Sequence, residues 1–159
     1  MTTTTDPAIA LCRPDDAHEL HRVTQAAFAG YAVLTPPTGA IHETVQELRA
    51  EIERAGAALA RRAGDVVGGL RFEAKPDHLW VRRVAVLPAL QGRGIGLALM
   101  QWTVEHARGL GLPEVRLGVR DALPANRSYY ERLGYVLVRT HEHELDRAAL
   151  WHELRLPVD

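Results

Sequence analysis

Apolar residues divide the middle of the chain into three predicted strands. The runs lie at 57–62, 66–72 and 78–86, and short turns separate them. Short turns between successive strands favour antiparallel pairing. The pattern therefore predicts a three-stranded antiparallel meander at the centre of a sheet.

Four other segments are predicted to be helices, three from their apolar residues and the one at 124–133 from the proline at its start and Gly134 at its end. Two amphipathic helices are predicted before the meander, at about 15–29 and 43–55, with a loop at 30–42 between them. A long helix is predicted at 94–110 and a shorter one at 124–133. The helix at 94–110 is apolar around most of its circumference, which is typical of a helix buried against a sheet.

Short apolar runs at 8–13, 115–119, 135–140 and 150–156 predict the remaining strands. The resulting order of elements is β-α-α-β-β-β-α-β-α-β-β. This order predicts an α/β (mixed α+β) fold, in which a mixed, mostly antiparallel sheet has helices on both faces. Residues 1–7 are expected to be a flexible N-terminal tail, and residues 8–159 a single domain.

Composition narrows the class of protein further. The chain has 159 residues, of which 47% are hydrophobic and 25% charged, an ordinary balance for one globular domain. Its formal net charge of -1 provides no basic field for nucleic acid. There is no membrane-spanning apolar run and no signal-peptide pattern, and the single Cys12 suits a reducing compartment. These features predict a cytoplasmic protein that has neither nucleic acid nor membrane as a partner.

The segment with the clearest chemistry lies between the third meander strand and the long helix. Residues 91–96 read QGRGIG. The free amides and the dipole of a helix N-terminus favour an anion, and glycine lets the backbone approach a phosphate closely. A simple glycine-rich turn is the alternative interpretation. The spacing fits neither the dinucleotide fingerprint nor a P-loop.

Residues 91–96 and a second segment, residues 126–135, resemble two motifs of one protein family. Residues 91–96 are similar to the Q/R-x-x-G-x-G/A pyrophosphate loop of the GNAT (Gcn5-related) N-acetyltransferases. Residues 126–135 (NRSYYERLGY) resemble the closing motif of the same family. A helix and a strand separate the two motifs, as in the family, and the order of elements from about 8 to 156 also matches. The chain therefore resembles a GNAT acetyltransferase over nearly its whole length.

This resemblance implies acetyl-CoA as the acyl donor, bound where two parallel strands, 78–86 and 115–119, separate. The backbone of 84–86 would pair with the pantetheine arm, and the loop backbone would hold the pyrophosphate. The Val86 amide is the candidate oxyanion donor. The implied cofactor-binding residues are Val84, Ala85, Val86, Gln91, Gly92, Arg93, Gly94, Ile95, Gly96 and Asn126.

Tyr130 is the candidate general acid. It lies four residues before Gly134, where the family carries a tyrosine directed at the CoA sulfur. A phenol with a pKa of about 10 stays protonated at neutral pH and can protonate a departing thiolate. A packed structural aromatic is the alternative interpretation. Tyr129 points about 100° away around the helix, so we expect it to be structural or to lie near the adenine.

The base is not identified by the motifs. The strand before the loop offers Arg82 and Arg83 where many relatives have a carboxylate. Glu73, on the neighbouring strand, is the candidate base, with His78 and water as alternatives. The loop at 30–42 is the expected acceptor wall, which Tyr31, His42 and Glu43 could line.

One cluster of histidines suggests a metal only weakly. His141, His143 and His152 could in principle hold zinc, but the sequence has no His-Glu-x-x-His helix, and exposed polar strand residues are the simpler interpretation. We therefore expect no metal.

The predicted function is an N-acetyltransferase that transfers the acetyl group to a primary amine by direct attack in a ternary complex. The acceptor is a small-molecule or peptide amine, with small amines and amino-acid-like molecules ranked above aminoglycosides. The alternatives are an O-acyltransferase of the same fold and a non-catalytic acyl-CoA-binding module. Since relatives are often dimers, a homodimer is an open expectation.

Overall fold

A computed structural model describes residues 6–34, 36 and 38–159, and within them seven strands form one mixed sheet. The strand order is β1-β2-β3-β4-β5-β7-β6. Only β4 and β5 are parallel, and the other neighbours are antiparallel, as the sequence predicts. The strands are β1 (Ala8–Leu11), β2 (Ala57–Arg62), β3 (Asp65–Ala74), β4 (Leu79–Val86), β5 (Glu114–Arg120), β6 (Val136–His143) and β7 (Asp146–Pro157).

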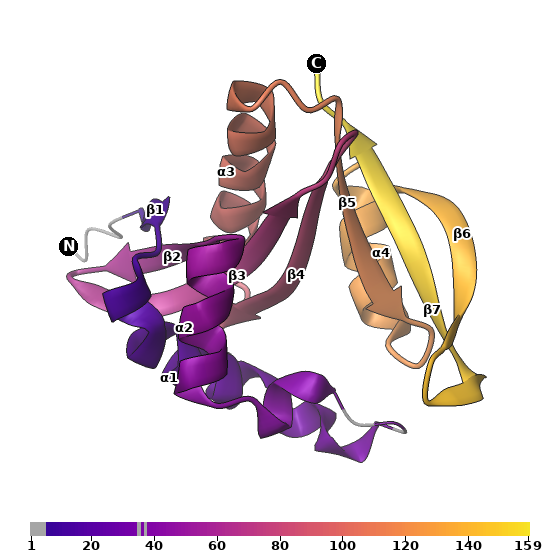
Figure 1. The fold of residues 1–159 in the computed structure, drawn as a ribbon, viewed down its shortest axis with the longest axis horizontal. Helices are drawn as coiled ribbons and strands as arrows, with labels where there is room; N and C mark the ends of the chain where they lie inside the picture. Colours follow the sequence, from indigo (N-terminus) through magenta and orange to yellow (C-terminus); the bar gives the residue numbers. More distant parts are fainter. Residues whose placement is uncertain (1–5, 35, 37) are drawn as a thin grey trace.

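Helices cover both faces of the sheet. In the described part of the chain they are α1 (Ala17–Phe28), α2 (Val45–Arg54), α3 (Ile95–Gly109) and α4 (Pro124–Arg132). Buried side chains of α1 and α2 belong to one core cluster, and those of α3 belong to a second cluster across the sheet (Figure 1). The predicted two-sided arrangement is therefore confirmed. None of these helices is both long and apolar enough to cross a membrane.

The segment between α1 and α2 contains more structure than the expected loop. It includes two short 3₁₀ helices, Ala29–Val33 and Gly39–His42. The second follows Thr38, whose Oγ1 accepts a hydrogen bond from the Ala40 amide at 3.4 Å. Proline and glycine in this segment break the α-helical pattern, but they still permit single 3₁₀ turns. Most of the expected N-terminal tail, residues 1–5, lies outside the described residues.

The last two strands are longer than the apolar pattern predicts. They run to His143 and from Asp146, so that Glu144 and Leu145 form a tight connection. Polar residues between 139 and 144 gave no apolar alternation, which is why the sequence suggested shorter strands. Backbone pairing across the hairpin extends them, because cross-strand pairs stabilise a sheet even where the side chains are polar.

One glycine lets α1 lie directly on the sheet. Gly69 is in the middle of β3, and a Cβ there would lie 2.4 Å from Leu20 Cδ1 of α1. Such a contact is far below van der Waals distance, so any larger residue would push the helix outward. This close packing fixes α1, and with it the segment that follows α1, against β3 and β4.

A β-bulge separates the two parallel strands. Pairing between β4 and β5 is confined to residues 79–81 and 115–117. Just beyond it, the register of β4 against β3 shifts, and Arg83 takes a left-handed φ of 56°. Because a bulge bends its strand and increases its twist, the second half of β4 turns away from β5 (Figure 1). The resulting gap in the sheet locates the candidate site.

Candidate active site

Two adjoining cavities lie where β4 and β5 separate. We call the first the strand cavity; it has a volume of about 380 Å³ and lies between residues 81–84 of β4 and 117–120 of β5. The second, the loop cavity, has a volume of about 510 Å³ and extends from β4 to the loop before α3. Both are lined by Tyr31, Val84 and Asn126, so together they form one continuous site.

The N-terminus of α3 opens into the loop cavity. Gly92 and Gly94 have φ angles of 79° and 86°, which non-glycine residues rarely adopt. The first intrahelical bond runs from the Ala98 amide to the Gly94 carbonyl at 3.0 Å. The amides of residues 95–97 therefore have no partner within the helix. An uncapped helix start of this kind, with glycine Cα atoms around it, can bind an anion through backbone N–H groups.

The free edge of β4 also faces the cavities. The Leu87 amide donates to the Val67 carbonyl on β3 at 2.9 Å. Since successive residues of an antiparallel strand direct their backbone groups to opposite edges, the backbone of Val86 faces the other edge. Gln91 Nε2 donates to the Val86 carbonyl at 3.2 Å, in agreement with this direction. Val84 has the same phase, so two residues of β4 offer backbone groups to an added strand.

Most of the sequence-predicted cofactor residues come together at this site. Ala85 and Arg93 do not line either cavity. The Ala85 side chain is buried in the core, opposite Gly69 of β3, and Arg93 is exposed on the loop. The predicted residues that line the loop cavity are Val84, Val86, Gln91, Gly92, Gly94, Ile95, Gly96 and Asn126.

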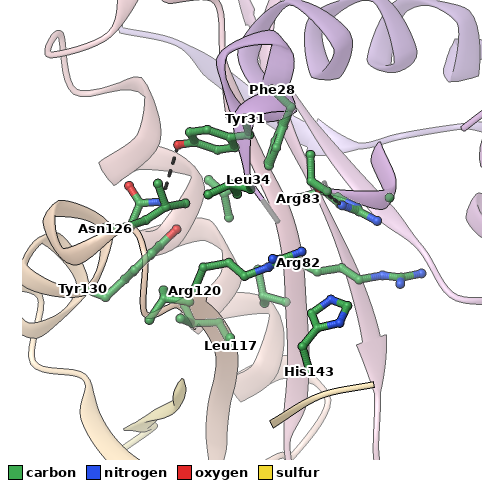
Figure 2. A pocket seen from close by; sticks show the side chains of 17 residues that line it. Phe28, Tyr31, Leu34, Arg82, Arg83, Leu117, Arg120, Asn126, Tyr130 and His143 are labelled. Atoms are coloured by element: carbon green, nitrogen blue, oxygen red, sulfur yellow. Dashed lines mark hydrogen bonds between the residues drawn. The ribbon is translucent and has the colours of Figure 1, made fainter. Parts of the chain in front are cut away.

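Tyr130 and Tyr129 face different cavities. Tyr130 lines the strand cavity beside Asn126, whose Nδ2 donates to the Tyr31 hydroxyl at 3.4 Å (Figure 2). Tyr129 lines the loop cavity, where a Cβ on Gly96 would lie 3.4 Å from its hydroxyl oxygen. Burial raises the pKa of Tyr130 well above its ordinary value, and neighbouring tyrosines add to the effect. The Tyr130 phenol is therefore protonated at all physiological pH values.

Glu73 lies away from the other predicted site residues. It lies opposite Trp80, near the start of β4, and lines neither cavity. Its carboxylate pairs with Arg54 at 3.1 Å and Lys75 at 3.4 Å. Slight burial alone would raise the pKa of Glu73, but these two cations outweigh it and hold the pKa below its usual value. The same end of the sheet holds His78, which pairs with Asp77 at 2.7 Å.

No carboxylate is among the described residues that line the two cavities. The imidazole in the strand cavity is that of His143, and its Nδ1 accepts from the Leu145 amide at 3.1 Å. The lone pair of this Nδ1 is thus already engaged in a hydrogen bond. Among the described residues, guanidinium groups line the strand cavity and no carboxylate does.

A buried ion-pair network supports one wall of the site. Arg71 of β3 is 1% exposed and contacts both carboxylate oxygens of Glu43 at 2.5 Å. It also donates to Glu51 at 3.2 Å, and Glu51 in turn pairs with Arg82. Glu43, expected to line the acceptor wall, lines neither cavity and instead binds Arg71. Arg71 is not among the site residues predicted from the sequence, although a lone arginine within the apolar run 66–72 is a signal of a buried ion pair.

The histidines singled out in the sequence, and Cys12, lie outside the two cavities, apart from His143. His141 pairs with Glu153 and His152 with Asp121, each at 2.8 Å. Within the described ranges, no group of three or more histidine, cysteine or acidic side chains could hold a metal ion. Cys12 is buried, and burial raises the pKa of its thiol to about 12, so the thiolate nucleophile is scarce.

Comparison with known proteins gives the fold and site their context. A model of the acetyltransferase (GNAT) family matches residues 18–135. The mycothiol acetyltransferase of Streptomyces coelicolor is 34% identical over 138 residues, which are 82% of this chain and 41% of that protein. The mycothiol acetyltransferase of Thermomonospora curvata is 35% identical over 120 residues, 72% of this chain and 38% of that protein. The chain thus spans about two-fifths of the length of these relatives.

Solved structures share the same fold. The ribosomal-protein-S18-alanine N-acetyltransferase from Escherichia coli has a TM-score of 0.77 at 18% identity and covers 96% of this chain and 94% of its own. The protein yncA from Salmonella typhimurium, solved with its cofactor acetyl-CoA, also has a TM-score of 0.77, at 17% identity, and covers 98% and 95%. The chain belongs to the GNAT family of acetyltransferases, which confirms the resemblance carried by its two motifs.

Proposed function

We propose that this protein transfers the acetyl group of acetyl-CoA to a primary amine. The observation that carries the proposal is the open N-terminus of α3 in one cavity, adjoining a second cavity into which Tyr130 projects. Membership in the GNAT family and a structural neighbour that holds acetyl-CoA support the same donor. The single buried Cys12 is in keeping with a cytoplasmic enzyme.

The donor site fits acetyl-CoA in shape and chemistry. When bound, acetyl-CoA supplies a thioester carbonyl that is activated for acyl transfer. The amides of residues 94–97 would hold the pyrophosphate. The free backbone edge of Val84 and Val86 would pair with the amides of the pantetheine arm, in the manner of an added strand. The Val86 amide would stabilise charge on the thioester oxygen, and Asn126 would contact the arm from α4.

Tyr130 holds the proton that the leaving sulfur needs. As the amine nitrogen forms a bond to the carbonyl carbon, the carbon–sulfur bond breaks and the Tyr130 hydroxyl donates its proton to the thiolate. The amine proton leaves to water, because the described lining residues include no carboxylate. Before the attack, the ammonium form of the acceptor must also lose a proton to become the free amine, which costs about 4–5 kcal/mol at pH 7. Nearby guanidinium groups lower this cost, since like charges disfavour an ammonium. Glu73 has no part in this proposal.

Thermal unfolding in the presence of different nucleotides tests the donor assignment. Acetyl-CoA at a hundredfold excess over its Kd should stabilise the fold by about 2.7 kcal/mol, because it binds the native state alone. NAD and ATP should stabilise it much less, since neither has a pantetheine arm for the edge of β4. If NAD and acetyl-CoA raise the unfolding temperature equally, the loop is a general nucleotide-binding site.

Gly94→Val directly tests whether the backbone at the start of α3 binds the pyrophosphate. Its φ of 86° disfavours any side chain, and a Cβ at this position would meet no protein atom within 4 Å, so it would project into open space beside the helix start. We expect the acetyl-CoA affinity to fall at least about tenfold, since charged hydrogen bonds to the backbone are each worth about 1.5–3 kcal/mol. The fold should lose only about 1–2 kcal/mol from the strained φ. If the variant is folded and its acetyl-CoA affinity, measured by calorimetry, is unchanged, the backbone around Gly94 does not bind the pyrophosphate.

An acceptor panel separates the amine from the alternatives. Free-thiol release should be measured with amines and alcohols, including the acceptor of the mycothiol acetyltransferases, to which the chain is similar. Turnover with amines alone supports the proposal, and turnover with alcohols favours an O-acyltransferase. Saturable acetyl-CoA binding without any turnover indicates a non-catalytic module.

A further inference from the structure

The strand cavity carries more positive charge than its surroundings neutralise. Three arginines, Arg82, Arg83 and Arg120, line it together with His143, and no acidic residue does so in the described part of the chain. Figure 2 shows the Arg120 guanidinium pointing toward the middle of the cavity, whereas Arg82 points away from it. The charge of the cavity therefore depends on which of these arginines have partners elsewhere.

Two nearby carboxylates are already occupied. Both oxygens of Glu43 bind Arg71, and the two oxygens of Glu51 bind Arg71 and Arg82. Arg83 lies near these four side chains. Three arginines are therefore close to only these two carboxylates. Arg83 has a hydrogen bond from Nη1 to the neutral Thr38 hydroxyl at 2.6 Å, and its buried Nε has no partner among the described residues.

Arg120 is in a similar position on the opposite wall. Its Nη1 donates to the Pro36 carbonyl at 2.8 Å, a neutral acceptor. No ion pair joins it to a carboxylate in the described part of the chain, and the adjacent Asp121 pairs with His152. Both guanidinium groups are partly buried, and burial lowers the pKa of each; Arg71 and Arg82 lower the pKa of Arg83 further. An anion that enters the cavity would replace the hydrogen bonds to water that the two guanidinium groups lose on burial.

We propose that the acceptor amine carries a carboxylate, which Arg120 and Arg83 bind while the amine faces the donor. A guanidinium offers paired N–H donors that match a carboxylate, and a charged hydrogen bond of this kind is strong in a partly buried site. The acceptor class is therefore an amino acid or a related amino carboxylate, and polycationic amines are excluded by repulsion. This inference rests on the proposed acetyl transfer.

Matched acceptors provide the test. α-, β- and γ-Amino acids should each be compared with their own carboxamides, by kcat/KM from thiol release. We expect the carboxylate form to be better by about tenfold to a hundredfold. An α-amino amide has the less basic amine, so the preference for the acid cannot come from amine reactivity. Equal or faster turnover of the carboxamides overturns the proposal.

Arg120→Gln should reduce this preference to about threefold or less, while Arg120→Lys, which keeps the charge, should retain a clear part of it. Arg155→Gln is the matched control, because Arg155 is exposed on β7 and lines neither cavity. Acetyl-CoA stabilisation should be the same in all three variants. A preference that survives in Arg120→Gln contradicts the assigned role.

Three further outcomes separate a failure of this inference from a failure of the donor assignment. If phosphoethanolamine is a much better acceptor than every amino acid, the two arginines bind a phosphate group, and the proposal that they bind a carboxylate is wrong. If acetyl-CoA stabilises the fold but no amino carboxylate is acetylated, the acceptor class is wrong although the donor site stands. Absence of acetyl-CoA binding instead contradicts the proposed function itself.

Discussion

Tyr130→Phe should lower kcat by about 10²–10⁴ while acetyl-CoA affinity stays nearly unchanged. The substitution removes one hydroxyl and keeps the ring, which packs edge-on against Tyr129 and Tyr135. The helix and the core should therefore be preserved. A proton donor to the leaving thiolate acts mainly in the transition state, so its loss appears in kcat. A thiolate with a pKa near 8.5 is a tolerable leaving group, and the effect could lie at the low end.

Tyr129→Phe is the matched control, because this neighbouring hydroxyl lies in the loop cavity beside Gly96. We expect Tyr129→Phe to change the acetyl-CoA affinity more than kcat. A slow Tyr129→Phe together with a fully active Tyr130→Phe would mean that the register of the closing motif is off by one. If neither variant is slow, water or the acceptor protonates the sulfur.

The pH dependence of kcat gives an independent check on the same residue. Because burial raises the pKa of Tyr130 above its ordinary value, the phenol keeps its proton as the pH rises. An acid that must be protonated loses activity only above its own pKa. The wild-type kcat should therefore not fall between pH 7 and about 10. A descending limb near pH 8 would assign the proton to a different group.

The fold followed closely from local patterns in the sequence. The meander of β2, β3 and β4 was predicted from apolar runs and the short turns between them, and the helix α3 from apolar residues around most of its circumference. Pairing of β5 between β4 and β7 could not be derived that way, since it depends on contacts between distant segments. The extension of the β6–β7 hairpin was also missed, because its polar end carries no burial signal.

The donor side of the site was easier to predict than the acceptor side. A helix start with glycines has a short sequence signature, and residues 91–96 do lie at the start of α3. The acceptor side is assembled from single residues on separate elements, such as Arg83 after the bulge and Arg120 at the end of β5. Glu73 illustrates the difficulty: it is on a neighbouring strand, but at the end of that strand farther from the cavities.

Arg71→Met should lower the free energy of unfolding by about 3–5 kcal/mol, the usual cost of removing one partner from a buried ion pair. Glu43 and Glu51 are only 12% and 11% exposed in their pairs with Arg71. Glu51 keeps Arg82 as a partner, but Glu43 would lose both of its close charged contacts. Urea denaturation measures the change. Because Glu43 directly follows the 3₁₀ helix Gly39–His42, the wall of the strand cavity should also loosen and the acceptor KM should rise.

Arg54→Met is the control for this prediction, because Arg54 pairs with Glu73 on the surface, where the side chains are 57% and 34% exposed. Its loss should cost no more than about 1 kcal/mol. The double variant Arg71→Met/Glu43→Gln should recover at least half of the stability that Arg71→Met loses, since the orphaned charge is then removed. If Arg71→Met unfolds at the same urea concentration as Arg54→Met, the network does not hold the wall. The segment between α1 and α2 would then be held by other contacts, such as the hydrogen bonds of His21 and Gln25 to the backbone carbonyls of Glu43 and Ala40.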